Sequence, residues 1–210
     1  SATRRVRVCT WPSTCCSADR RATPPLATLR ATLTRLIGAQ VCLHAAMTGL
    51  RMAAPLMALR EGYSPAAVGL LLALFALSQV FLALPAGRFT DRHGMRRPVR
   101  LAVVSAVAGN ALAAAWPVFP VLCVAALMTG AASGLTVIAL QRYVGQLASD
   151  ASSLRRVFSW LAIGPSISNF IGPFLSGLLI DASGFRAAYL MLATLPLLTL
   201  SLIHISEPTR

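Results

Sequence analysis

The first long apolar run of the sequence contains polar groups that could bind a ligand or move a proton. His44, Thr48, Arg51 and Pro55 follow one another at intervals of three or four residues, which places them on one face of a helix that should look into a cavity. An arginine inside a bilayer costs about 2.5 kcal/mol or more, so Arg51 is expected to bind an anionic group of a substrate or to pair with an acidic side chain. The alternative is that Arg51 extends to the membrane surface. For His44 the alternatives are a proton carrier and a packed interior histidine.

Two amide side chains interrupt later apolar runs. Gln79 and Asn110 join His44, Thr48 and Arg51 as candidates for lining a substrate cavity. No acidic residue lies deep in any apolar run, so an obvious proton carrier is lacking.

A short charged segment, Gly87 to Arg97, separates two of the apolar runs. Gly87 has no side chain and could let another helix pass close by. Asp91 suits a helix N-terminus or an arginine cluster, and Gly94 permits a turn. The candidate functional residues of this segment are Gly87, Asp91, Arg92, Gly94, Arg96 and Arg97. Its arginines suit contact with anionic lipid head groups.

The glycines, Asp91 and the arginines of this segment resemble the loop between the second and third spans of major facilitator superfamily transporters. One position departs from that pattern, since Met95 stands where the family usually has arginine. The resemblance implies that these six residues form a conformational gate, a loop that locks the cytoplasmic side by docking onto a second bundle of helices. A generic basic loop is the alternative interpretation.

Small residues recur along the fifth apolar run, at Gly164, Ser168, Gly172 and Ser176. A proline bends a helix and frees a carbonyl, and small neighbours let a partner helix pack there. Gly172-Pro173 followed by Ser176-Gly177 resembles the fifth-span motif of antiporters in the same family, with serine at the first place of the closing glycine pair. The predicted bend comprises Gly172, Pro173 and Gly177. A plain packing helix is the alternative.

The motif implies efflux by proton exchange, although Ala126 stands where drug-proton antiporters carry an arginine in the fourth span. Six spans resembling the N-terminal half of a twelve-span transporter imply two bundles that rock about a central site, so that the site opens to each side in turn. The expected function is therefore secondary active transport of small organic molecules. A half-size transporter acting as a homodimer and a non-transporting six-span scaffold remain alternatives.

The elements that must position these residues are membrane-spanning helices. With 210 residues, 56% hydrophobic content and mean hydropathy +0.69, the chain has apolar runs too long for a soluble domain. We predict an all-α membrane protein whose spans cover about 33–59, 66–86, 101–118, 121–141, 157–180 and 187–199. Pro117 and Pro120 divide the long uncharged run into the third and fourth spans.

Charge indicates orientation. All 19 basic residues are arginine, and the net charge is +13, which by itself would suggest nucleic-acid binding. However, the arginines lie in the N-terminal tail and loops, five after the second span and three after the fourth, against one in each opposite loop. The positive-inside rule then places the N-terminus in the cytoplasm of what we expect to be a bacterial inner membrane, with lipids and no nucleic acid as partners.

Cofactor and enzyme chemistry are not expected. The five cysteines, Cys9, Cys15, Cys16, Cys42 and Cys123, lack metal-ligand spacing, so neither a metal nor a disulfide is predicted. An intramembrane serine protease would need a histidine in a later span than its serine motif, and the sequence has only His44, His93 and His204.

The two ends of the sequence stand apart from the spans. Residues 1–31 are arginine-rich and lack apolar periodicity, which predicts a disordered tail or a mis-called upstream reading frame; by composition they also resemble a transit peptide. Residues 200–210 resemble a translated sequencing adapter, which would end the genuine sequence near Thr199. We therefore expect a fragment that lacks its C-terminal six-span half and is inactive alone.

Overall fold

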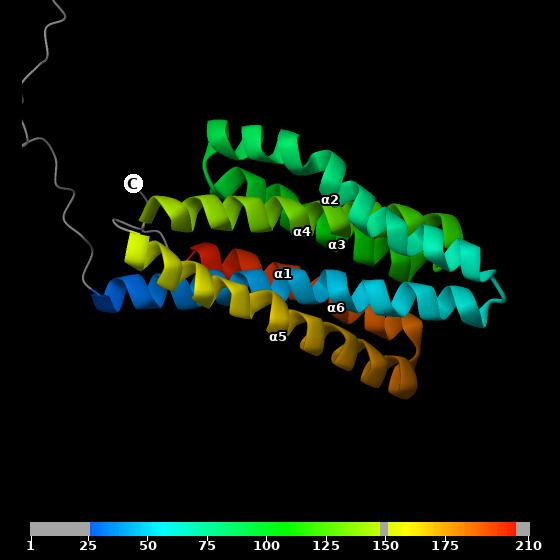
Figure 1. The fold of residues 1–210 in the computed structure, drawn as a ribbon. Coiled ribbons are helices and arrows are strands. Elements are labelled where there is room, and N and C mark those ends of the chain that lie inside the picture. The colour runs from blue at the N-terminus through cyan, green and yellow to red at the C-terminus, as the bar shows by residue number, and fades with distance from the viewer. Residues whose placement is uncertain (1–25, 148–150, 205–210) are drawn as a thin grey trace, which may run out of the picture.

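The computed structural model describes residues 26–147 and 151–204, and it confirms six long helices (Figure 1). They are α1 (Leu26–Arg60), α2 (Pro65–His93), α3 (Arg96–Ala115), α4 (Phe119–Leu147), α5 (Ala151–Ser183) and α6 (Phe185–His204). All six are long and apolar enough to cross a membrane. The described residues contain no strand, so the all-α prediction is correct.

The helices form two layers of three. α1 packs between α5 and α6, α4 packs between α2 and α3, and the layers meet where α1 contacts α4 and where α3 contacts α6 (Figure 1). α1 and α4 are therefore the central helices. α2 and α5 each contact mainly one central helix, which leaves much of their apolar surface exposed.

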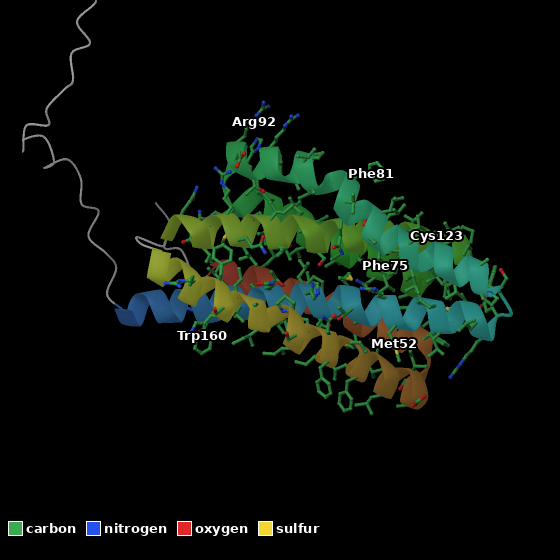
Figure 2. All side chains as sticks on the ribbon, in the orientation of Figure 1. Met52, Phe75, Phe81, Arg92, Cys123 and Trp160 are labelled. Carbon is green, nitrogen blue, oxygen red and sulfur yellow. The ribbon has the colours of Figure 1, made fainter. Side chains whose placement is uncertain are left out.

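Side-chain burial follows this arrangement. Phe75 points into the bundle and is 2% exposed, whereas Phe81 and Trp160 point away from it and are 72% and 56% exposed (Figure 2). The buried cluster around Phe75 includes Leu50 of α1 and Tyr189 of α6. Exposed apolar side chains of this kind suit contact with lipid.

The helix ends have local causes. The Ser64 hydroxyl accepts a hydrogen bond from the Ala67 N–H at 3.3 Å, and Pro65 supplies the first residue of α2. Gly94 ends α2 with φ +68°, a conformation that favours glycine. Gly184 separates α5 from α6 with φ +85°.

The charged segment differs from the predicted loop. α2 continues through His93 and α3 begins at Arg96, so only Gly94 and Met95 lie between the two helices. The arginines therefore occupy the last turns of α2 and the first turns of α3. The physical reason is that the helical hydrogen bonds continue through arginine, a good helix former, until glycine permits the turn.

Close approach between helices occurs at other glycines than Gly87. A Cβ on Gly130 would lie 2.7 Å from the Phe75 carbonyl oxygen, and a Cβ on Gly172 would lie 2.5 Å from the Ala45 carbonyl oxygen. A Cβ on Gly87 would meet nothing within 4 Å, so no described helix approaches Gly87 closely, and a close contact there with a helix of a second bundle stays a prediction. Gly87 faces away from the neighbouring helices that the structure describes.

Several helices are longer than the predicted spans. α1 includes residues 26–31, which were expected to belong to the tail, while residues 1–25 lie outside the described part of the chain. α6 continues past Thr199, whose hydroxyl donates to the Ala39 carbonyl oxygen at 3.0 Å, and Leu202 packs near Gly38. The adapter origin of residues 200–210 stays a prediction, and 205–210 are outside the described residues.

Candidate functional site

Hydrogen bonds tie α1 to α5 in both directions. The Thr48 hydroxyl donates to the Ser168 carbonyl oxygen at 2.9 Å, and the Ser168 hydroxyl donates to the Val41 carbonyl oxygen at 3.2 Å. Thr48 and Ser168 are both buried. Small residues at Gly49 and Gly172 bring the two backbones close enough for these bonds, so the predicted ladder of small residues on α5 faces α1.

Beside this contact lies a cavity of about 250 Å³ between α1, α2 and α5. It is lined by Thr48, Arg51, Met52, Leu72, Asn169 and Pro173. Its wall is mainly apolar, with the Arg51 guanidinium and the Asn169 amide as its polar donors, because the Thr48 hydroxyl proton is already used in bonds to main-chain oxygens. Apolar walls with a few placed polar groups are typical of small-molecule sites.

Arg51 lies well inside the span. It precedes the end of α1 at Arg60 by nine residues, or about 13 Å along a helix. Its side chain is exposed, and it forms no ion pair or hydrogen bond with another residue of the described chain. In the described residues, acidic side chains occur only at Glu61, Asp91 and Asp181, all close to helix ends. Arg51 therefore carries an uncompensated charge at depth.

The predicted face of α1 is divided between two neighbouring helices. The His44 ring nitrogen Nδ1 lies 2.8 Å from the Ser133 hydroxyl of α4, whereas Thr48 bonds to α5. Of the four residues, only Thr48 and Arg51 line the cavity; Pro55 is buried. Two of the four residues therefore border this cavity, and their role in a substrate site stays a prediction.

The two predicted amides, Gln79 and Asn110, are not among the residues that line this cavity. Gln79 is half-buried on α2, with its Cγ 3.4 Å from where a Cβ on Gly134 of α4 would stand. Asn110 is fully buried in α3, where its amide nitrogen donates to the Ala106 carbonyl oxygen at 2.8 Å and its Oδ1 has no partner. A role for these two residues in lining a substrate cavity stays a prediction.

Asn169 was missed in the sequence. It is polar in an apolar run and stands four residues before Pro173, which has no N–H, so the Asn169 carbonyl loses its usual helical partner. The position four residues before a proline was the available signal. The predicted bend at Gly172, Pro173 and Gly177 thus borders the cavity through Pro173, while the Gly172 backbone contacts α1.

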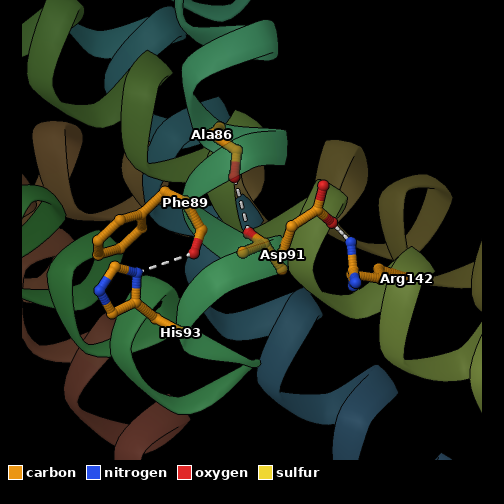
Figure 3. A network of polar contacts seen from close by, with 6 residues as sticks. Ala86, Phe89, Asp91, His93 and Arg142 are labelled. Carbon is orange, nitrogen blue, oxygen red and sulfur yellow. Dashed lines mark hydrogen bonds and ion pairs between the residues drawn. The ribbon is translucent and has the colours of Figure 1, made fainter.

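A second polar site occupies the charged end of α2. Asp91 forms an ion pair with Arg142 of α4, and the two side chains point toward each other (Figure 3). They line a cavity of about 120 Å³ together with Thr90, Gly94, Met95, Ala139, Tyr143 and Gln146. The expectation that Asp91 would meet an arginine is met by a residue from a different helix. Arg92 points away from the bundle (Figure 2).

The last turn of α2 is further fixed by His93. Its Nδ1 donates to the Phe89 carbonyl oxygen at 3.1 Å, and its ring lies 4.5 Å from the Phe89 ring, centroid to centroid (Figure 3). These contacts stabilise the helical form of the segment just before Gly94. Arg96 and Arg97 are exposed at the start of α3.

No cluster of metal-ligating side chains occurs among residues 26–147 and 151–204. Cys42 and Cys123 are free thiols in the spans. Cys9, Cys15 and Cys16 lie outside the described residues.

Six long apolar helices with exposed apolar faces define an integral membrane protein that crosses the bilayer several times. A sequence model described as the Major Facilitator Superfamily matches residues 36–210, and the chain belongs to that family of membrane transporters. The bundle has the helices of an N-terminal half of that fold. A search of curated proteins finds no match.

Proposed function

We propose that the chain acts in proton-coupled efflux of small organic molecules, as a secondary active transporter. The observation that carries the proposal is the open, mainly apolar cavity at Arg51, whose charge has no described counter-charge and lies well inside a span of a protein of this transporter family. The fifth-span glycine-proline motif supports efflux by proton exchange. Proton coupling would use a carrier outside the acidic residues described here, because these lie near helix ends.

The proposal includes a second six-helix bundle that closes the Arg51 cavity on its open side. The two bundles rock about the site, which faces each side of the membrane alternately. The charged end of α2 lies in the cytoplasm, because exposed arginines gather there at positions 88, 92, 96, 97 and 100, against Arg60 and Arg186 at the opposite end. We place the protein in a bacterial inner membrane with its N-terminus inside.

The test begins with the gene. The source locus is re-sequenced across the codons of Thr199 and Leu200 with a library that does not use the suspected adapter. The protein that the re-sequenced gene encodes and the present chain are then reconstituted in separate liposomes. We expect an imposed proton gradient to drive saturable export of organic probes by a product with twelve spans, and no saturable flux from the present chain alone. Saturable flux by the present chain alone would show that a second bundle is not needed. If neither protein shows saturable flux, the proposed transport function is rejected.

The ion pair between Asp91 and Arg142 is proposed to hold the cytoplasmic gate. Because both side chains are exposed, at 52% and 39%, losing the pair should cost less than about 1 kcal/mol of unfolding free energy. We expect Asp91→Asn to lower flux severalfold while the melting temperature barely changes. The double variant Asp91→Arg with Arg142→Asp should recover much of the flux.

Arg88→Gln serves as the matched control, since it removes an exposed charge three residues before Asp91 on α2 without touching this pair. A gating role would be contradicted if Asp91→Asn transported normally, or if Arg88→Gln lowered flux as much as Asp91→Asn.

A further inference from the structure

We propose that the ligand of the Arg51 cavity is a small organic carboxylate with an apolar body. This inference rests on the proposed transport function and specifies the chemical class of its substrate. It depends on which charges and hydrogen-bonding groups reach the cavity.

The first step concerns charge. Arg51 is the charged residue among the six that line the cavity, and no described residue neutralises it. An arginine held at this depth without a counter-charge is unfavourable, so an anion that enters the cavity gains more there than it would at the surface. A cationic ligand would be repelled by the same field. The charge therefore selects anions.

The second step concerns hydrogen bonding. A guanidinium presents a planar fork of N–H donors that matches the two oxygens of a carboxylate. The Asn169 amide, on the facing helix α5, is exposed and can add another donor. Thr48 cannot add one, since its hydroxyl proton is directed to the Ser168 carbonyl oxygen. The available donors fit one carboxylate better than a larger polyanion.

The third step concerns the remaining wall. Met52, Leu72 and Pro173 supply apolar surface next to the guanidinium. The volume of about 250 Å³ lies just below the usual range of about 300–1,000 Å³ for small-molecule pockets, so the ligand is small or extends into the open side of the cavity. A ligand with a carboxylate and an apolar body could bind the guanidinium with the first and pack against the apolar side chains with the second.

The proposal is tested by equilibrium binding, independently of flux. The purified chain in phosphatidylcholine nanodiscs is titrated calorimetrically with 3-phenylpropanoate, 3-phenylpropanamide and 3-phenylpropylammonium, which share one skeleton and differ in charge. We expect the carboxylate to bind at least about tenfold more tightly than the amide or the ammonium.

Variants assign the effect to the cavity. Arg51→Gln should weaken carboxylate binding by about 10- to 100-fold, because a charge-assisted hydrogen bond is lost. Arg51→Lys should keep part of the affinity, since the charge remains and the fork is lost. Arg186→Gln removes an exposed arginine at the start of α6, which does not line the cavity, and should bind like the wild type. Circular dichroism checks that each variant is folded.

The assignment is wrong if the carboxylate shows no saturable binding, if the ammonium binds as tightly, or if Arg51→Gln binds the carboxylate like the wild type. A protein that exports cations would fail this test and still pass the flux test. Conversely, selective carboxylate binding by the present chain, without saturable flux through the twelve-span product, would support the ligand class and count against transport.

Discussion

Gly172→Ala is expected to destabilise the bundle severely. The added Cβ would collide with the Thr48 hydroxyl oxygen and would lie 2.5 Å from the Ala45 carbonyl oxygen and 2.9 Å from the Gly49 nitrogen. The last two atoms belong to the α1 backbone and cannot rotate away, so α1 and α5 must separate and lose the hydrogen bonds that join them. Overpacking usually costs about 1–3 kcal/mol, and we expect the upper end or more here.

Gly177→Ala is the matched control on the same helix. Its new Cβ would lie 3.7 Å from the end of the flexible Met52 side chain, an ordinary contact. Thermal unfolding in detergent, followed by circular dichroism, should show a markedly lower melting temperature for Gly172→Ala and little change for Gly177→Ala. Equal melting temperatures for the two variants would show that α1 and α5 are not in this close contact.

Arg51→Ala is expected to remove transport while leaving membrane insertion intact. The arginine costs about 2.5 kcal/mol or more at this depth, so its removal makes insertion easier rather than harder. If it binds the substrate, flux at low substrate concentration should fall by about 10- to 100-fold, the value of a charge-assisted hydrogen bond. The product of the re-sequenced gene is reconstituted in liposomes. The measurement is its initial rate of substrate flux, divided by the amount of protein inserted in the membrane.

Arg186→Ala provides the control for charge alone, because this arginine is exposed at the start of α6, at the end of the bundle opposite the charged segment. Its flux should match the wild type. Normal transport kinetics for Arg51→Ala would remove Arg51 from the substrate site. If the Arg51→Ala variant failed to insert in the membrane, Arg51 would instead have a structural role.

At the charged segment, the sequence motif predicted the turn but not the partners of its residues. Gly94 was assigned to the turn and adopts the positive φ that the turn requires. Asp91 was expected to meet arginines, but Arg142 comes from a helix far along the chain. Gly87, assigned to a close helix contact, faces open space in this bundle. A motif fixes local backbone chemistry, whereas the partner depends on how neighbouring helices are rotated.

The sequence alone determined the six helices, the depth of Arg51 and the turn at Gly94. Apolar run length sets the number of spans, because a backbone in lipid must satisfy its own hydrogen bonds within a helix. Only the tertiary structure decided that Asn169 meets Arg51 at one cavity, that His44 turns to Ser133, and that Asn110 is enclosed. Helical periodicity shows which residues share a face, but the packing of α1 against α4 and α5 selects the neighbour that each face meets.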